Sequence, residues 1–374
     1  MKVKLGDTES HFRTVSYDRD NDHVCLIEQR LLPHDFEILS SSHFRETADA
    51  IKDMVVRGAG AIGATAAYGF AQGIRQWEGE ADVSPQFDQY VNHVFDTLGQ
   101  ARPTAVDPMN ALKWMLGRLK ALNSSRVSEW KEASLELAEQ FASDNVEDCR
   151  AIGRYGEPLI REGMNILTHC NAGWLAFVDF GSATAPIYSA WDAGKRFHVY
   201  CDETRPRLQG AALTAWELFN HGVDHTIIAD NAAGFLMSQG KIDMVITGSD
   251  RVIAATGEVA NKIGTFTKAV LAHHHKIPFY VAIPTSTLDW ELESGAQIPI
   301  EERSEQEIHT VSGIGTHSGA RQSVRITNQG SPASNFGFDI TPPELISGII
   351  TPAGIFKPHE LMQLRNSAAA ADLN

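Results

Sequence analysis

One short segment, residues 248–266, holds an acid, an amide and a cation that together suit a small phosphorylated molecule. It reads G-S-D-R-V-I-A-A-T-G-E-V-A-N-K-I-G-T-F, so Asp250 stands near its start and Asn261 and Lys262 near its end. The apolar run 242–247 before it is typical of a buried parallel strand. Ligands of open α/β sheets bind just past the carboxyl ends of such strands. We expect Asn261 and Lys262 to open the next helix, where backbone N–H groups and the helix dipole favour an anion.

A thiol follows a second apolar run, residues 166–169. Cys170 stands in the stretch T-H-C-N-A-G. A lone cysteine is usually a buried apolar residue, but its expected place at the same sheet edge as Asp250 also suits chemistry. We expect His169, directly before it, to be a hydrogen-bonded core group rather than a ligand or base.

A third polar segment, residues 202–210, reads D-E-T-R-P-R-L-Q-G and also lies between an apolar run and a helical pattern. Its charged residues are expected to pair with one another in a turn, with Gln209 facing the site. The run of histidines at 273–275 ends a helical pattern, where cations suit the dipole. No second ligand cluster accompanies it, so a metal site is not expected.

The stretch G-A-G-A-I-G at 58–63 matches the dinucleotide-binding pattern G-x-G-x-x-G letter for letter. That function needs a strand before the glycines and an acid about 20 residues further on. Residues 50–56 are not a clean strand, and Glu78 stands in a polar loop, so a chance match is favoured. Arg57 leading glycines into a helix still suits a single phosphate group. Tight helix packing is the alternative role of the glycines, above all of Gly63, Gly69 and Gly73, and both roles can hold.

Composition limits the classes of function. The 374 residues carry 32 basic and 47 acidic side chains, a formal charge of −15. This charge repels nucleic acid and anionic membranes, so a phosphate would need a local basic pocket. No C-x-x-C occurs, no apolar run reaches a membrane span, and the amino end lacks a signal core. We expect a soluble, cytoplasmic protein with reduced thiols. The four cysteines are Cys25, Cys149, Cys170 and Cys201.

The order of patterns predicts two domains. Residues 1–145 are expected to form a smaller, mainly helical domain that contributes Arg57 and Arg102. Residues 146–374 are expected to form a doubly wound, Rossmann-like α/β domain, because apolar runs alternate with helical segments. The expected strands of that domain are 166–169, 197–201, 225–229, 242–247 and 279–283. Its expected helices are 182–193, 208–220, 232–239 and 261–275.

Other elements are expected before and after this alternation. In the first domain we expect a strand pair near 12–17 and 23–28, a serine-rich loop at 40–42 and a loop at 78–86. The expected helices there are 44–56, 64–74, 109–122 and 128–141, with a joining helix near 144–162. Residues 102–108 are expected to form a rigid turn, residues 323–327 a strand, and residues 366–374 a frayed tail.

Eight motifs occur along the chain in a familiar order: R-G-A-G-A-I-G, R-P-T-A-V, T-H-C-N-A-G, D-E-T-R-P-R-L-Q-G, G-S-D-R, N-K-I-G-T-F, P-F-Y-V-A and I-P-I-E-E-R. Together with S-P-A-S-N-F-G-F-D-I-T-P near the end, they resemble the family of methylthioribose-1-phosphate isomerases, enzymes of methionine salvage. The same family includes regulatory subunits of the translation initiation factor 2B and archaeal ribose-1,5-bisphosphate isomerases. The usual R-G-A-P is R-G-A-G here, G-A-D-R is G-S-D-R, and N-G-D is T-G-E at 256–258.

The resemblance implies the isomerisation of an aldose 1-phosphate to a ketose 1-phosphate, without metal or cofactor, by a homodimer. By matching motifs, Cys170 and Asp250 look like the catalytic pair. The implied substrate contacts are Arg57, Gly58, Ala59, Arg102, Gln209, Asn261 and Lys262. The sugar itself stays open among 5-methylthioribose 1-phosphate, 5-deoxyribose 1-phosphate and ribose 1,5-bisphosphate.

The chemistry leaves two routes open. A sugar phosphorylated at C1 has no free aldehyde, so an acid must first open the ring, and Asp250 is the candidate. A neutral aspartic acid requires desolvation, which raises its pKa. Cys170 then either removes the C2 proton as a thiolate or shapes a dry pocket for a hydride shift from C2 to C1. The competing class is a regulatory protein that binds sugar phosphates or nucleotides without turnover.

Overall fold

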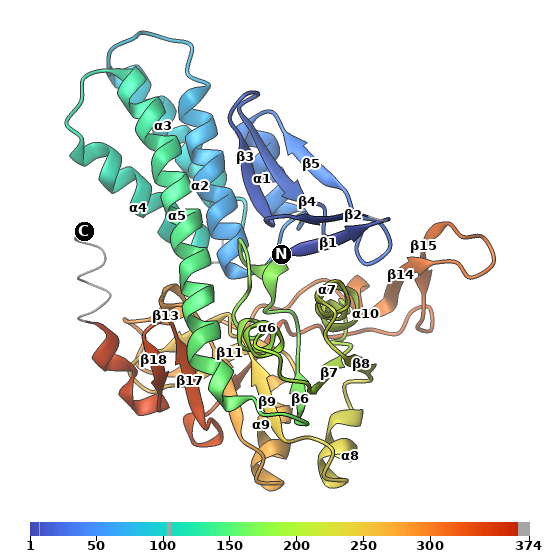
Figure 1. The fold of residues 1–374 in the computed structure, drawn as a ribbon. Helices are drawn as coiled ribbons and strands as arrows, with labels where there is room; N and C mark the ends of the chain where they lie inside the picture. Colours follow the sequence, from blue (N-terminus) through green and yellow to red (C-terminus); the bar gives the residue numbers. More distant parts are fainter. Residues whose placement is uncertain (7, 103–105, 366–374) are drawn as a thin grey trace. The chain divides into compact units, whose positions relative to one another are not determined.

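The computed structural model describes residues 1–6, 8–102 and 106–365, and they form two compact units (Figure 1). The first comprises residues 1–31, 36–149 and 174–181, and the second residues 32–35, 150–173 and those from 182 onward. The main division falls at 149/150, inside the long helix α5 (Val127–Gly156), whereas the sequence predicted it at 145/146. Parts of the predicted turn at 102–108, and the tail 366–374, lie outside the described residues.

The first unit contains more β-structure than predicted. β1 (Lys2–Leu5) and β2 (Thr8–His11) form a hairpin, and β3 (Val15–Asp18), β4 (His23–Ile27) and β5 (Ile38–Ser41) form an antiparallel sheet. The serine-rich stretch predicted as a loop therefore lies partly in β5. Register explains this, because Ser40 and Ser41 face Cys25 and Val24 across the ladder.

Five helices complete the first unit. They are α1 (Phe44–Lys52), α2 (Ala59–Arg75), α3 (Pro85–Gly99), α4 (Val106–Ala121) and the first part of α5. Helix α3 was not predicted, although Ser84 caps it and Pro85 opens it, which are both start signals. The two helices predicted at 128–141 and 144–162 are the single helix α5. Helix α1 ends at Lys52, earlier than predicted.

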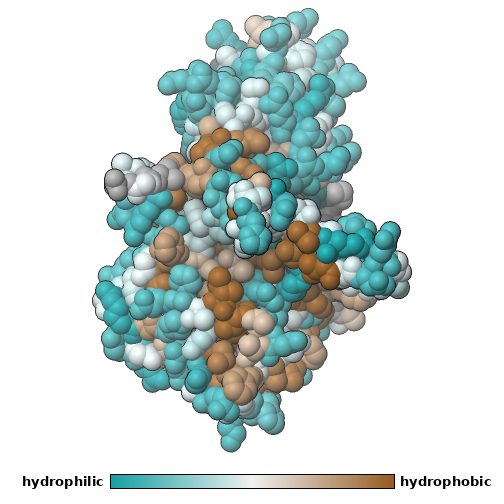
Figure 2. Space-filling view, turned by 90° about the vertical axis from the view of Figure 1, so that its right-hand side faces the viewer, coloured by the Kyte–Doolittle hydropathy of each residue, from teal (hydrophilic) through white to brown (hydrophobic). Residues whose placement is uncertain are grey.

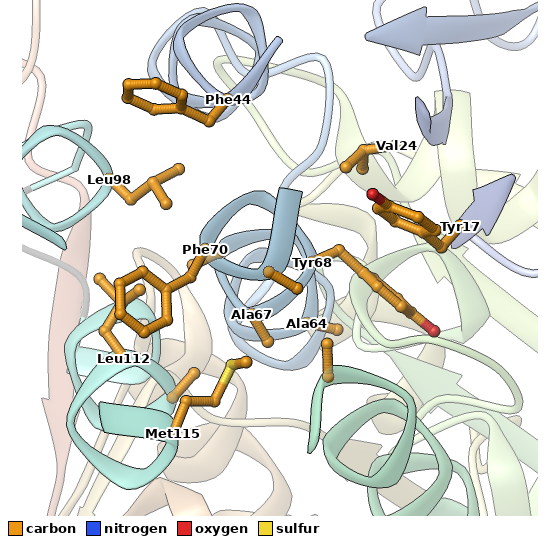
Figure 3. Close-up of a cluster of buried hydrophobic side chains, with 14 of the residues drawn as sticks. Tyr17, Val24, Phe44, Ala64, Ala67, Tyr68, Phe70, Leu98, Leu112 and Met115 are labelled. Carbon is orange, nitrogen blue, oxygen red and sulfur yellow. The ribbon is translucent and has the colours of Figure 1, made fainter. Parts of the chain in front are cut away.

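Helix α2 is the centre of this unit (Figure 3). Every residue from Gly60 to Ile74 is buried, as expected for a helix covered on all sides. Phe44, Leu98, Leu112 and Met115 belong to the apolar cluster around it. Small residues let the neighbours approach: a Cβ on Gly69 would lie 2.8 Å from Thr47, and one on Gly73 would lie 2.4 Å from Val94. The predicted packing role is confirmed for these two glycines, while Gly63 makes only ordinary contacts at 3.4 Å.

The second unit is built on a seven-stranded sheet in the order β18-β17-β12-β9-β6-β7-β8, which confirms the doubly wound fold. All neighbours pair in parallel except β18 (Gly354–Phe356) on β17 (Gly348–Thr351). The remaining strands are β6 (Asn165–Thr168), β7 (His198–Asp202), β8 (His225–Ile228), β9 (Met244–Thr247) and β12 (Phe279–Ala282). All five predicted strands are therefore present.

Helices cover the sheet in two pairs. Tyr188 of α6 (Ala185–Asp192) contacts α7 (Ala215–His221), and Gly234 of α8 (Ala232–Ser238) lies against Leu271 of α9 (Thr265–His274). Right-handed crossovers place the two pairs on opposite faces, because the chain runs outward in opposite directions from β6 and from β9. The predicted helix at 208–220 instead begins with a π-helical turn, Gly210–Thr214.

Smaller β-elements complete this unit. A four-stranded sheet has the order β13-β10-β11-β16, formed by Leu288–Asp289, Arg251–Ile253, Val259–Lys262 and Phe338–Thr341. A hairpin joins β14 (Thr310–Ile314) to β15 (Arg321–Arg325), near the strand predicted at 323–327. Two short helices, α10 (Gln306–His309) and the 3₁₀ segment Pro358–Leu364, lie towards the carboxyl end. Within the described residues, no helix has the length and apolar character needed to span a membrane.

Candidate functional site

The sheet of the second unit has its topological switch point between β6 and β9. From β6 the chain proceeds through β7 to β8, and it then returns to place β9 on the other side of β6. Crevices at the carboxyl ends of such strands are where doubly wound folds bind ligands. Cys170 follows β6 by two residues and Asp250 follows β9 by three. The fold thus brings the two loops with the predicted chemistry to one place.

The two loops are in direct contact. A Cβ added to Gly248 would lie 2.3 Å from the Cβ of Ala172, so only glycine lets the loop after β9 pass so close to the loop after β6. The strands below them are hydrogen-bonded in register, with Leu167 beside Val245. This contact limits how far the Cys170 and Asp250 main chains can separate.

Cys170 is held in an unusual main-chain conformation. Its φ of 66° lies in the left-handed region, which costs a non-glycine residue about 1–3 kcal/mol unless its surroundings fix it. Its N–H donates to Thr204 Oγ1 at 2.9 Å, and its C=O accepts from Thr214 Oγ1 at 2.7 Å. The residue is 8% exposed. The structure thus fixes the main chain at Cys170 and leaves its thiol in a nearly dry setting.

Asp250 is held quite differently. Its N–H donates to the C=O of Ala260 across the β10–β11 hairpin at 3.0 Å. Its side chain is exposed. The desolvation that a proton-donating Asp250 would require is therefore not supplied by the folded chain.

His169 is the hydrogen-bonded core group that we predicted. Its Nδ1 lies 2.8 Å from Asp202 Oδ2, and its Nε2 lies 2.9 Å from the C=O of Ile263. Lys268 Nζ is 3.1 Å from the same Asp202 oxygen. All three side chains are almost fully buried. The network ties the end of β6 to the end of β7 and to the start of α9.

The same network includes the only group of three potential metal ligands found among the described residues: His169, Asp202 and Asp230. Both carboxylate oxygens of Asp230 already accept backbone N–H groups, from Thr204 at 2.7 Å and Arg205 at 2.8 Å. Both nitrogens of His169 are also engaged. These atoms and Asp202 Oδ2 therefore hold loops together, whereas Asp202 Oδ1 has no hydrogen-bond partner among the described residues.

Asn261 and Lys262 end strand β11 and do not open a helix, which corrects our prediction. They pair with Asp339 and Phe338 of β16, and helix α9 begins only at Thr265. The ladder with β16 continues the extended chain up to Lys262, and Gly264, with φ 103°, makes the turn into the helix.

Both side chains are nevertheless buried in the second unit. Asn261 Nδ2 donates to Thr265 Oγ1 at 2.9 Å, and Lys262 Nζ lies 5.5 Å from the Phe338 ring centre. Asp339 caps the helix instead, since its two oxygens accept from Gly264 N–H at 2.6 Å and Phe266 N–H at 3.1 Å. Burial raises the pKa of Asp339, and these two N–H groups oppose the rise.

Gln209 stands at the start of the π-helical turn and is 5% exposed. Its Oε1 is buried and has no hydrogen-bond partner among the described residues, and the same holds for Asp202 Oδ1 and Thr247 Oγ1. Most buried polar atoms in proteins are paired. These three stand at or just beyond the carboxyl ends of β7 and β9. They are the kind of groups that the hydroxyls of a sugar can satisfy.

Arg57, Gly58, Ala59 and Arg102 belong to the first unit and are half-buried. Gly58 is the N-cap residue of α2 with φ 85°, and a Cβ there would lie 2.4 Å from Ala176, so only glycine fits. Gly58 has no side chain with which to cap this helix, and the first turn contains no acid. A helix start of this kind after an arginine suits an anion. Arg102 directly precedes residues outside the described part of the chain.

The dinucleotide match is not supported. No strand lies between β5 and α2 in this described part of the chain, so the glycines do not follow a strand. The charged segment after β7 also differs from the prediction of a self-paired turn. Asp202 pairs with His169 and Lys268, and Arg207 with Glu307 at 3.4 Å. Thr204, Thr214 and Asp339 were missed, because nothing in a sequence marks which hydroxyl or carboxylate will meet a distant backbone group.

The chain belongs to the initiation factor 2 subunit family, whose model matches residues 55–358. Among its relatives, a methylthioribose-1-phosphate isomerase of Brucella anthropi is 47% identical over 367 residues, which cover 95% of this chain and 96% of the relative.

Two solved structures extend the comparison. A 5-methylthioribose 1-phosphate isomerase from Pyrococcus horikoshii OT3 has a TM-score of 0.84 at 39% identity and covers 98% of this chain and 97% of its own. A structure described as the translation initiation factor eIF-2B, subunit delta, from A. fulgidus has a TM-score of 0.80 at 38% identity, covering 94% and 98%. The family therefore contains both an enzyme and a translation factor at similar distance from this chain.

Proposed function

We propose that this chain is a methylthioribose-1-phosphate isomerase, an aldose–ketose isomerase that converts 5-methylthioribose 1-phosphate to 5-methylthioribulose 1-phosphate in methionine salvage. Full-length similarity to the Brucella anthropi and Pyrococcus horikoshii isomerases supports this. The observation in the structure that carries it is the meeting of the Cys170 and Asp250 loops at the switch point. The chain retains both a thiol and an acid there, which a protein that only binds a sugar phosphate would not require.

The proposed roles follow from chemistry and position. Asp250 donates a proton to the ring oxygen, so that the C1–O bond breaks and positive charge develops at C1. Arg57, Arg102 and Lys262 balance the phosphate, and an ionised phosphate is well matched by such donors. Gly58 and Ala59 let the start of α2 approach the phosphate. Gln209 and Asn261 contact the sugar hydroxyls, which is consistent with the unpartnered buried Gln209 Oε1.

Two routes complete the reaction. In the first, the hydrogen on C2 moves with its electron pair to C1 while the C2 hydroxyl loses its proton, which leaves a ketone at C2. In the second, a Cys170 thiolate removes the C2 proton, and the resulting enol phosphate is protonated at C1. The nearly dry position of Cys170 favours the first route, since exclusion of water protects a cation at C1 from attack. Asp250 needs the bound substrate to shield it from water, because its side chain is exposed in this structure.

Turnover of three substrates tests the proposal. The purified protein is expected to isomerise 5-methylthioribose 1-phosphate faster than 5-deoxyribose 1-phosphate, and both faster than ribose 1,5-bisphosphate. Binding of these sugars without any product would instead favour a regulatory protein, the class represented by the A. fulgidus relative. With deuterium at C2 of the substrate, retention of the label at C1 of the product supports the hydride route. Complete loss of the label to solvent would assign the thiolate route.

We further propose that the enzyme is a homodimer and acts in the cytoplasm. Phe219, Ile227 and Phe235 are 66%, 49% and 65% exposed on α7, the edge strand β8 and α8. Figure 2 shows apolar residues gathered over the lower part of this face. Exposed apolar surface of this kind is typical of protein interfaces. Light scattering that gives twice the mass of 41.0 kDa is the expected result, and a monomer at micromolar concentration would exclude it.

A further inference from the structure

The N–H and the C=O of Cys170 are both hydrogen-bonded by threonine hydroxyls, which belong to the segment 204–214. Thr204 Oγ1 accepts the Cys170 N–H at 2.9 Å and donates to the C=O of Asp202 at 3.1 Å. Thr214 Oγ1 donates to the Cys170 C=O at 2.7 Å. Thr204 and Thr214 are 0% and 1% exposed, so no water competes for these bonds.

The Thr214 hydroxyl that bonds Cys170 is itself held by further buried hydrogen bonds. Asn171 Nδ2 donates to Thr214 Oγ1 at 3.2 Å and to Glu217 Oε1 at 2.7 Å. Tyr188 donates its hydroxyl to the other oxygen of Glu217 at 2.7 Å. Burial, and the Glu217 carboxylate beside it, raise the pKa of Tyr188 far above its ordinary value, so this hydroxyl keeps its proton. Because Asn171 Nδ2 is a donor, Thr214 Oγ1 accepts from it, and the proton of Thr214 is left to point to the Cys170 C=O.

The π-helical turn connects Thr214 to Gln209, a proposed substrate contact. In a π-helix residues five apart are bonded, as Ala215 N–H is to Gly210 C=O here. Gln209 and Thr214 are also five apart and therefore about one turn apart. The turn thus places the buried, unpartnered Gln209 Oε1 and the hydroxyl that holds Cys170 on one side of the helix. Single π-turns are frequent at functional sites.

We propose that Thr214 is a positioning residue of the isomerase reaction. It acts through Cys170, by holding this residue at φ 66° and so fixing the direction of the thiol relative to Gln209. This inference rests on the proposed function for its kinetic consequence, but the position of the thiol can be measured without substrate.

The variants are Thr214→Val, which removes the hydroxyl and keeps the shape, and Thr214→Ser, which keeps the hydroxyl. Thr341→Val is the matched control, because Thr341 is also fully buried and its Oγ1 has no partner among the described residues. Thr204→Val removes the hydroxyl that accepts from the Cys170 N–H. It replaces Thr214→Val in the experiment if that variant does not fold.

With 5-methylthioribose 1-phosphate, kcat of Thr214→Val is expected to fall about 10-fold to 100-fold, since a small misplacement of a reacting group has an effect of this size. KM is expected to stay within about threefold, because the proposed phosphate contacts are untouched. Thr214→Ser is expected to recover most of the turnover, and Thr341→Val to match the parent. A kcat of Thr214→Val within about twofold of the parent would overturn the proposal, and so would equal losses in Thr214→Val and Thr341→Val.

The second measurement is the rate at which iodoacetamide modifies Cys170, followed by peptide mass spectrometry with Cys25 as internal reference. Thr214→Val is expected to change the Cys170 rate severalfold and Thr214→Ser to restore it, while the Cys25 rate stays constant. An unchanged Cys170 rate overturns the positioning role. If the parent itself turns over none of the three sugars, the proposed function fails, and this measurement still decides whether Thr214 positions the thiol.

Discussion

Two loops leave neighbouring strands at the switch point and hold their chemical groups in opposite ways. Cys170, after β6, is buried, and side-chain hydroxyls bond both its N–H and its C=O. Asp250, after β9, is exposed, and among the described residues its backbone is held by main-chain pairing across a hairpin. The main-chain conformation of Cys170 is therefore built into the folded chain. The dry environment that Asp250 needs in its proposed role as the acid is not, so the proposal requires the bound substrate to supply it.

The largest expected effect is the loss of turnover when either Cys170 or Asp250 is replaced. Cys170→Ser and Asp250→Asn are both expected to lose at least about 100-fold in kcat, the usual size of a lost acid–base or positioning group. They should differ in stability. The free energy of unfolding of Asp250→Asn is expected to lie within about 0.5 kcal/mol of the parent value, as for other exposed substitutions. That of Cys170→Ser is expected to be about 1 kcal/mol lower than the parent value, because a polar hydroxyl is buried.

Steady-state kinetics and urea unfolding measure both quantities. Near-parental turnover in either variant removes that residue from its proposed role. Equal losses of stability would contradict the contrast between a buried and an exposed group.

The next effect concerns the anchor of the Cys170 loop. His169→Phe keeps the approximate shape of the ring but leaves Asp202 with Lys268 as its remaining side-chain partner. We expect a loss of about 2–4 kcal/mol in the free energy of unfolding, because one partner of a buried ion network is removed. The urea midpoint measures this loss. A change below about 0.5 kcal/mol would show that the network does not hold this loop.

A smaller effect is expected on the side of Asp250. Asp339→Ala removes the cap of α9, the helix that follows β11, and β11 is the second strand of the hairpin that starts next to Asp250. The expected loss is about 1–2 kcal/mol, the size found for other side chains that cap the start of a helix. Thermal unfolding of this variant beside His169→Phe ranks the two anchors. A greater loss in Asp339→Ala would reverse our conclusion that the Cys170 loop is the more firmly held.

The smallest effect is expected in the first unit, on helix α5. Burial, and then the nearby Asp144, raise the pKa of Asp148 to about 7. A carboxyl whose folded-state pKa is raised contributes its stability fully below the unfolded pKa of about 4 and loses it as the pH rises through 7. Asp148→Asn should therefore stabilise the protein more at pH 8 than at pH 5, by about 1 kcal/mol after allowance for partial exposure.

Melting temperatures at the two pH values test this, with Asp250→Asn as the exposed comparison. An equal shift at both pH values would refute the raised pKa of Asp148. No change in turnover is expected.

The sequence predicted the sheet of the second unit well because period and run length report burial directly. Five apolar runs became five strands, and the places of Cys170 and Asp250 at strand ends followed from them. The elements that were predicted wrongly are those whose conformation is set by contacts with distant parts of the chain. Ser40 and Ser41 became part of a strand through pairing with β4, and Asn261 and Lys262 stayed extended through pairing with β16. The hydroxyl of Thr214 reaches a carbonyl 44 residues earlier, a contact that no local pattern reports.

The division of the chain has a consequence for the order in which the protein is made. Residues 150–173, with β6 and Cys170, lie in sequence between two pieces of the first unit. The later piece completes that unit: Thr14 Oγ1 donates to Trp174 C=O at 3.0 Å, and Gln29 Nε2 to Leu175 C=O at 2.8 Å. These buried bonds cannot form until the ribosome has passed Leu175. When they do form, both ends of the segment that contains Cys170 are held by the first unit. The entropy cost of pairing β6 with its neighbouring strands is then smaller, because the ends of the loop are already close together.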